Sequence, residues 1–158
     1  MFKKNSGLTL IELLIVLGII SIIATISTLN LFDFKAGQDL DFSTKEVVAT
    51  IRDAQTKSIT QENLGASEVW GVRFTNPSVG VGFYEVWKGV SYPGILNSKK
   101  FLTPNTEFET PAKGSFLDIT FQKITGVTNS SQTVKIRIIN DITKFRIVTV
   151  SSNGSIDF

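Results

Sequence analysis

The feature that most constrains this chain is an uninterrupted apolar run near its start. From Leu13 to Phe32, twenty consecutive residues carry no charge. At the rise of an α-helix, twenty residues extend about 30 Å, which is the thickness of the hydrocarbon core of a bilayer. The run therefore predicts a single transmembrane helix. Lys3 and Lys4 precede it, so the positive-inside rule predicts a cytoplasmic N-terminus and places the rest of the chain outside.

A cleaved secretory signal is the first alternative to a membrane span. Such a signal has a shorter apolar segment, of about 7–15 residues, followed by an A-x-A cleavage site. Here the run is longer, and the nearest match, Ile23-Ala24-Thr25, does not fit. A plain signal anchor is the second alternative, but it leaves Glu12 unexplained. An ionisable side chain in a membrane helix costs free energy and indicates a functional residue, provided that a partner can be named.

The residues around Glu12 resemble the class III signal of type IV pilins and pseudopilins. A short basic leader ends at Gly7, and Leu8-Thr9-Leu10-Ile11-Glu12 follows directly before the apolar run. In that family a prepilin peptidase cuts after the glycine and N-methylates the new first residue, and a glutamate stands fifth after the cut. The resemblance implies processing at Gly7 and Leu8, although Leu8 stands where phenylalanine is commonest. It also implies that Glu12 neutralises the N-terminal amine of a neighbouring subunit during filament assembly.

The helix is expected to continue beyond the apolar run, because no proline occurs before Pro77. Apolar residues then recur at three- and four-residue spacing, which is the pattern of a helix with one buried face. The buried stripe comprises Leu40, Val47, Val48, Ile51, Ala54, Ser58 and Ile59. We therefore predict one helix of about fifty residues that ends near Gly65 and has a membrane-spanning first half and a packed second half.

After Gly65 the pattern changes from helical spacing to alternation. Short segments rich in β-branched and aromatic residues indicate strands. These segments are 69–74, 81–88, 116–124, 134–139, 144–150 and 156–158. The segment 92–114 contains three of the four prolines and is predicted to be a loop. The predicted class is α+β, with an antiparallel sheet packed against the second half of the helix, which is also the pilin architecture.

The predicted organisation is a leader over residues 1–7, a transmembrane and assembly half of the helix over 8–32, and a periplasmic or extracellular globular domain over 33–158. Within the family, the globular part resembles the minor pseudopilin H and FimT-type group. That resemblance rests on the helix end at 48–59, on Ile119-Thr120-Phe121 before Gly126, and on Ser152-Asn153-Gly154-Ser155-Ile156. It implies a structural subunit of a type IV pilus-like or type II secretion filament. The implied partners are the prepilin peptidase, other pilins and the inner membrane.

Four basic residues near the C-terminus form a candidate anion-binding site. If Asn140-Asp141 is a two-residue turn, Arg137 lies opposite Lys144 and Lys135 lies opposite Arg146, all on one face of the sheet. Like charges directly opposite each other are destabilising, so this arrangement suggests an anionic partner or intervening carboxylates. The alternatives are therefore a DNA- or substrate-binding pilin of an uptake pilus, a solvated face with neighbouring carboxylates such as Asp118, or a different register of the hairpin.

Composition offers few candidates for catalysis. The chain has no cysteine and no histidine, which excludes thiol nucleophiles, His-based triads and the usual zinc ligands. No calcium-loop, nucleophile-elbow or paired-acid motif is present. The net charge is only +2, so any surface for nucleic acid must be local. We therefore expect neither an enzyme nor a bound metal or cofactor.

Overall fold

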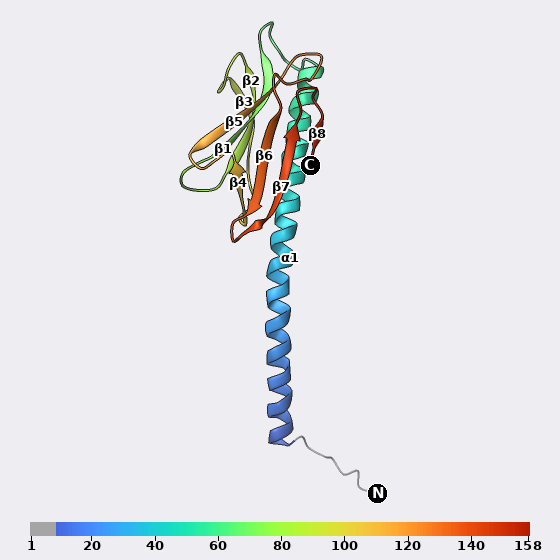
Figure 1. Ribbon diagram of the computed structural model, residues 1–158, viewed down its shortest axis with the longest axis vertical. Coiled ribbons are helices and arrows are strands. Elements are labelled where there is room, and N and C mark those ends of the chain that lie inside the picture. The colour runs from blue at the N-terminus through green and yellow to red at the C-terminus, as the bar shows by residue number, and fades with distance from the viewer. Residues whose placement is uncertain (1–8) are drawn as a thin grey trace. The chain divides into compact units, whose positions relative to one another are not determined.

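The computed structural model describes residues 9–158, apart from the side chains of residues 26–30, 32 and 33. The chain divides into two compact units, Met1–Lys35 and Ala36–Phe158, which we describe separately. The first element, α1, runs from Leu10 to Ile59 and contributes residues to both units (Figure 1). Its 50 residues confirm the predicted length of the helix.

The helix ends earlier than the sequence predicts, at Ile59 rather than near Gly65. Gln61 and Asn63 adopt positive φ angles of 56° and 51°, which an α-helix does not accommodate. The amide of Glu62 donates a hydrogen bond of 3.0 Å to the carbonyl of Lys57 and closes the last turn. Left-handed residues before Gly65 therefore terminate α1.

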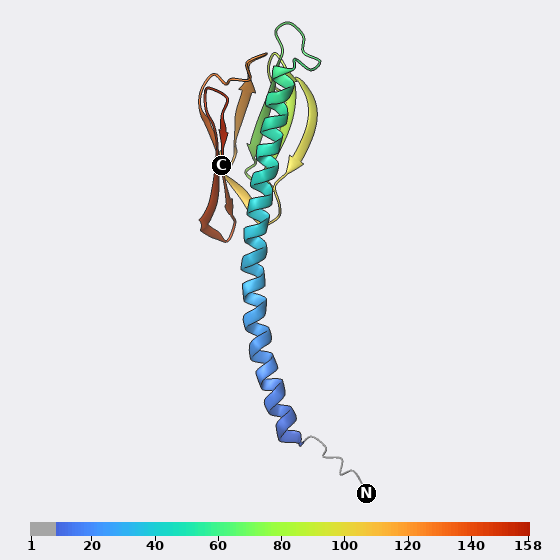
Figure 2. The ribbon, with the colours of Figure 1, turned by 90° about the vertical axis from the view of Figure 1, so that its right-hand side faces the viewer.

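The described chain after α1 forms two antiparallel four-stranded sheets. Sheet A has the order β3-β2-β1-β5, and sheet B has the order β4-β6-β7-β8. The strands are β1 (Val69–Asn76), β2 (Phe83–Gly89), β3 (Ile95–Phe101), β4 (Thr106–Thr110), β5 (Ser115–Phe121), β6 (Gln132–Ile138), β7 (Asp141–Val150) and β8 (Ile156–Asp157). Figure 2 shows the two sheets on opposite sides of the C-terminal half of α1. The α+β class is confirmed, but the expected single sheet is two sheets.

Two strands, β3 and β4, lie within the segment 92–114 that was predicted to be a loop, so that prediction is wrong. β3 is an edge of sheet A, and its side chains are exposed or half-buried on both faces. β4 is an edge of sheet B, and its buried residues Thr106 and Phe108 alternate with Glu107 and Glu109. Edge strands need little apolar surface and often carry charges, so their local sequence resembles that of a loop.

The core of the second unit lies where α1 meets both sheets. The predicted stripe on α1 is buried at every position except Ile59, which is 43% exposed. Sheet A contributes Trp70, Val72, Phe74, Ile119 and Phe121, and sheet B contributes Phe108, Val134, Ile136, Val148 and Val150. The rings of Phe74 and Phe108 meet edge to face with centroids 5.8 Å apart, which joins the inner faces of the two sheets.

Side-chain hydrogen bonds also attach α1 to the segments around it. The hydroxyl of Ser58 donates to the carbonyl of Phe121 at 2.8 Å. The amide of Gln55 donates to the carbonyls of Gly126 at 2.9 Å and of Gly154 at 2.7 Å. The end of β5, the turn before β6 and the turn before β8 are therefore all bound to the last two turns of the helix.

Candidate assembly helix and basic hairpin

Glu12 lies in the first turn of α1, where it forms a capping box with Thr9. The amide and the hydroxyl of Thr9 each donate to Oε2 of Glu12 at 2.8 Å, and the amide of Glu12 donates to Oγ1 of Thr9 at 3.3 Å. This arrangement satisfies backbone amides that the start of a helix leaves unpaired. This capping role was not predicted, although the spacing Thr-x-x-Glu signals it in the sequence. The assembly role of Glu12 stays a prediction.

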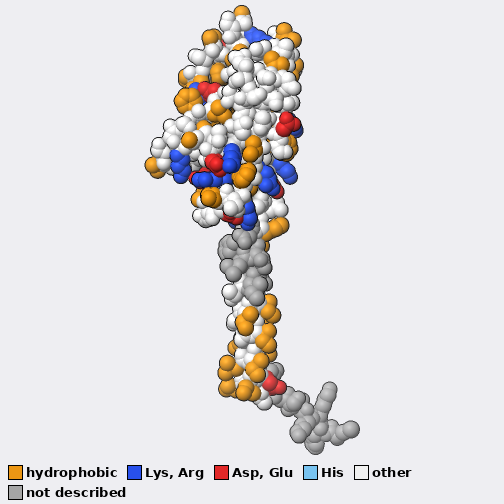
Figure 3. Space-filling view, in the orientation of Figure 1, with side chains coloured by type: hydrophobic (Ala, Val, Ile, Leu, Met, Phe, Trp, Pro, Cys, Tyr) orange, Lys and Arg blue, Asp and Glu red, His pale blue; other side chains and the backbone are white. Residues whose placement is uncertain are grey.

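The apolar side chains after Glu12 are exposed on the isolated chain. From Leu13 to Ile23, the exposed fractions of the large apolar side chains range from 46% at Val16 to 64% at Leu14. The consecutive residues Leu13–Leu17 are all more than 45% exposed, and successive residues of a helix are about 100° apart, so these five cover every side. Figure 3 shows one face of this apolar segment. A helix that is apolar all round needs lipid or other helices around it.

Within the part of the chain that the structure describes, no helix reaches the length and hydropathy of a membrane span. The predicted span, 13–32, includes residues 26–30 and 32, whose side chains lie outside the described set. The predicted leader, 1–7, and the predicted processing residues Gly7 and Leu8 also lie outside the described residues. The span and the processing site therefore stay predictions.

The predicted register of the β6–β7 hairpin is wrong. Lys135 pairs with Ile147 and Arg137 pairs with Phe145, rather than with basic residues of β7. An irregularity directly after Arg137 shifts the pairing by one residue relative to the register that a two-residue turn would give. A shift of one residue moves every side chain of a strand to the opposite face.

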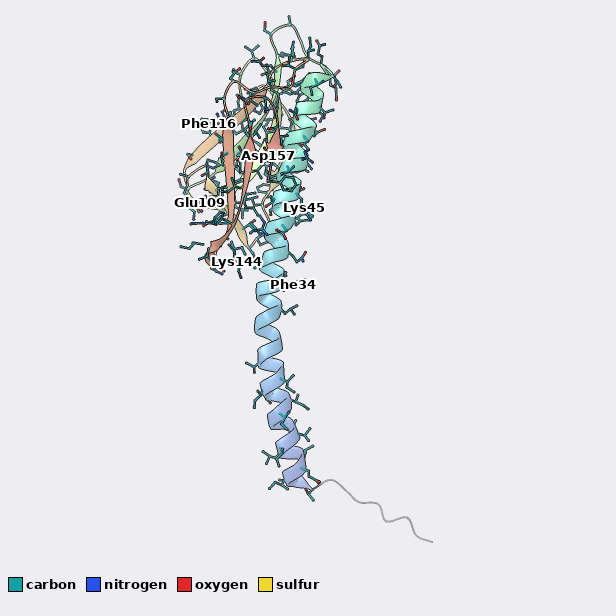
Figure 4. All side chains as sticks on the ribbon, turned by 45° about the vertical axis from the view of Figure 1, so that its right-hand side comes forward. Phe34, Lys45, Glu109, Phe116, Lys144 and Asp157 are labelled. Atoms are coloured by element: carbon teal, nitrogen blue, oxygen red, sulfur yellow. The ribbon has the colours of Figure 1, made fainter. Side chains whose placement is uncertain are left out.

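The four basic residues consequently do not share one face. Lys135 and Arg137 lie with Phe145 on one face of sheet B, and Lys144 and Arg146 belong to the other. Each of the four contacts a carboxylate: Lys135 Nζ–Glu109 Oε1 at 2.9 Å, Arg137 Nη2–Glu107 Oε1 at 2.7 Å, Lys144 Nζ–Asp141 Oδ2 at 3.3 Å and Arg146 Nη2–Asp41 Oδ1 at 2.9 Å. Figure 4 labels Glu109 and Lys144. Figure 3 shows basic and acidic side chains interspersed on the lower part of the globular unit.

Glu107 is the most enclosed carboxylate of this network. Arg137 contacts it from β6, and the ammonium of Lys113 lies 3.3 Å from its other oxygen. Burial by itself raises the pKa of Glu107, but hydrogen bonds from Arg137 and Lys113 outweigh burial and hold the pKa below its ordinary value of 4.5. Glu107 is therefore ionised at neutral pH and compensates part of the positive charge. DNA contact by this hairpin stays a prediction.

Comparisons with known proteins found similarities in the N-terminal sequence and in the fold. Residues 2–28 match the family described as the prokaryotic N-terminal methylation motif. No curated protein sequence matches the chain. Two crystal structures of the type IV minor pilin FimU from Pseudomonas aeruginosa share the fold. One has a TM-score of 0.51 and 14% identity over 75% of this chain and 90% of the FimU chain. The other has a TM-score of 0.54 and 14% identity over 77% and 88%.

An identity of 14% shows a shared fold alone, whereas the methylation motif is a property of the sequence. The motif covers residues 2–28, and the two structural matches cover 75% and 77% of this chain. The chain thus carries the prokaryotic N-terminal methylation motif over residues 2–28 and has a fold similar to that of the minor pilin FimU.

Proposed function

We propose that this chain is a minor pilin or pseudopilin, a structural subunit of a type IV pilus-like or type II secretion filament. The observation that carries the proposal is the first part of α1, which is apolar on every side, exposed, and charged only at Glu12 among its described side chains. Lipid covers such a surface before assembly, and the helices of other subunits cover it afterwards.

We propose that the subunit is first anchored in the membrane and is then assembled into a filament. Before assembly, residues 8–32 anchor the chain in the cytoplasmic membrane, with the N-terminus in the cytoplasm and residues 33–158 outside. Prepilin peptidase removes residues 1–7, and the new amine at Leu8 becomes methylated, as the motif over residues 2–28 supports. The processed subunit then joins other pilins in a helical filament.

Glu12 provides the polar contact of the proposed assembly step. Both hydrogen bonds from Thr9 end on Oε2, so Oε1 can accept a hydrogen bond from the ammonium of a neighbouring Leu8. Among packed helices the dielectric is low, so opposite charges attract strongly and an unpaired carboxylate is costly. Glu12 therefore serves both its own helix end and the adjacent subunit.

Processing is tested by the intact mass of the chain recovered from a host that has prepilin peptidase. We expect the mass to fall by residues 1–7 and to rise by one methyl group. Gly7→Val should remain at the precursor mass, because a side chain at the cleavage position hinders the peptidase. Recovery of the wild-type chain at its full-length mass would contradict the proposal.

Assembly is tested with Glu12→Gln, which removes the charge but keeps the cap. Glutamine is accepted at this position of a capping box, so the helix end stays intact. Membrane insertion should be unchanged or improved, because burying an amide costs less than burying a carboxylate. We expect the ratio of protein in sheared filaments to protein in membranes to fall. An unchanged ratio would show that Glu12 is not an assembly contact.

The alternative function, a DNA- or substrate-binding minor pilin of an uptake pilus, depends on Lys135, Arg137, Lys144 and Arg146. These four residues lie on two faces of the sheet, and each of them contacts a carboxylate. Both observations argue against a binding role, so we prefer the structural function.

A further inference from the structure

A row of alternating charges crosses all four strands of sheet A. Lys99 of β3 pairs with Glu85 of β2, Glu85 pairs with Arg73 of β1, and Arg73 pairs with Asp118 of β5. Nζ of Lys99 lies 3.5 Å from Oε1 of Glu85. The guanidinium of Arg73 donates two hydrogen bonds to Asp118, at 2.6 and 2.5 Å. The row therefore starts with a base at the β3 edge and ends with an acid at the β5 edge.

The neighbouring row on the same face places an exposed aromatic ring at each edge. Phe101 of β3 and Phe116 of β5 are both 58% exposed. The ring of Phe101 lies against that of Phe83, with centroids 5.9 Å apart. The ring of Phe116, labelled in Figure 4, lies under the guanidinium of Arg73, with 3.9 Å between the carbon Cζ and the ring centroid. Each edge thus presents one charge and one aromatic ring, two residues apart.

Both edges of sheet A lack a second strand among the described residues, since β3 adjoins β2 and β5 adjoins β1. An edge strand presents backbone N–H and C=O groups to which another strand can add. All neighbouring strands of sheet A are antiparallel, so β3 runs in the direction of β1 and β5 runs in the opposite direction. A β5 strand from another copy would therefore add to β3 as an antiparallel neighbour.

We propose that β3 of one copy pairs with β5 of a second copy, so that sheet A continues from copy to copy. With Lys99 opposite Asp118, opposite charges face each other across the new junction. The same register places Phe101 opposite Phe116, and aromatic pairs in this position are stabilising. Joining two β3 edges about Lys99, or two β5 edges about Asp118, would instead place like charges opposite each other. Charge complementarity therefore favours pairing of β3 with the β5 edge of a second copy over pairing of two β3 edges or two β5 edges.

The proposed contact joins two different edges of the same molecule, so it can repeat without closing on itself. It is also short, because an irregularity in the β2–β3 pairing after Val86 leaves Ser98–Phe101 as the regular part of β3. Four residues per strand provide register and orientation more than affinity. The contact belongs to the globular unit, so it goes beyond the proposed function and does not depend on processing at Gly7.

Engineered cysteines test this pairing, because the chain has no cysteine of its own. The test variant is Phe101→Cys with Phe116→Cys in the full-length chain, purified in detergent and oxidised. Within one chain the two positions are three strand spacings apart, about 14 Å, which is too far for an intrachain disulfide. Across the proposed junction their Cβ atoms are about 5 Å apart. We expect disulfide-linked dimers and larger multimers.

The matched control is Phe101→Cys with Thr120→Cys. Thr120 lies on the same face of β5 as Phe116 but four residues, or about 14 Å, along the strand, so this variant should stay monomeric. Each single variant should also stay monomeric. Dimers from a single variant would indicate a symmetric contact and overturn the proposal, as would equal cross-linking of the matched and mismatched pairs.

A second matched pair guards against a folding defect in the first. Lys100→Cys with Leu117→Cys reports the same register from the other face of the sheet. Tryptophan fluorescence establishes that each variant is folded, and the intact mass of the same samples reports processing independently. Multimers from either matched pair would support the edge pairing. Folded matched pairs that stay monomeric would overturn it.

Discussion

Asn76, the last residue of β1, connects the two sheets through its side chain. It is 2% exposed, and its amide nitrogen donates to the carbonyls of Phe108 at 2.9 Å and of Pro111 at 2.8 Å. Phe108 belongs to β4 of sheet B, and Pro111 begins the connection to β5. Asn76→Ala removes both donors while leaving the backbone of β1 unchanged. Two buried carbonyls then lose this partner.

A buried polar group without its hydrogen bond costs about 1–3 kcal/mol. Two affected carbonyls therefore predict a loss of about 2–6 kcal/mol in the free energy of unfolding. Urea lowers the stability of a small domain by about 2 kcal/mol per molar, so the unfolding midpoint should fall by about 1–3 M. This is a large fraction of the total stability of a typical domain, about 5–15 kcal/mol.

The measurement is a urea titration of the full-length chain in detergent, followed by the fluorescence of Trp70 and Trp87, which are both buried. Gln122→Ala is the matched control, because Gln122 also donates from an amide, to Asn129 at 3.0 Å, but at an exposed site. Exposed substitutions of this kind change stability by less than about 0.5 kcal/mol. If both variants unfold at the same urea concentration, the assigned role of Asn76 is refuted.

Two further predictions concern the charged residues of sheet B. Because the pKa of Glu107 is lowered in the folded state, its contribution to stability is complete above its unfolded pKa and is lost as pH falls through the folded value. Glu107→Gln should therefore reduce the free energy of unfolding at pH 7 and make that free energy decline less as the pH falls. The measurement is a series of urea titrations at different pH values. An equal decline for the variant and the wild type below pH 7 would contradict this prediction. If the basic hairpin contacts DNA, affinity for duplex DNA should fall with salt, with a slope near −0.9 per phosphate neutralised, and Arg137→Glu with Arg146→Glu should abolish binding. Absence of salt-sensitive binding by the wild-type chain at low ionic strength would remove the DNA hypothesis.

The helix and its buried face could be predicted from sequence because their signals are local. The spacing of Leu40, Val47, Ile51 and Ala54 depends only on helical geometry, and all four are buried as expected. The division of the strands into two sheets could not be predicted, because alternation identifies a strand without naming its neighbours. β3 was missed for a different reason, because a strand with little covered surface has little apolar pattern.

The residues of the basic hairpin could be identified from the sequence, but their arrangement could not. The residues Lys135, Arg137, Lys144 and Arg146 were identified, but their faces depend on an irregularity after Arg137 that no local signal marks. Their carboxylate partners come partly from distant segments, Glu107 and Glu109 on β4 and Asp41 on α1. By contrast, the capping role of Glu12 required only the threonine three residues earlier, and could have been predicted.

The hydrogen bonds of Gln55 and Ser58 determine how the globular unit bears mechanical load. These two side chains hold the end of β5 and the turns at Gly126 and Gly154, and they lie within one turn of each other on α1. A pull along the helix axis therefore loads all three hydrogen bonds together with the buried stripe of the helix. Bonds loaded in parallel share the force, whereas bonds that are peeled apart break one after another. Tension applied through α1 is thus shared among these contacts rather than borne by each in turn.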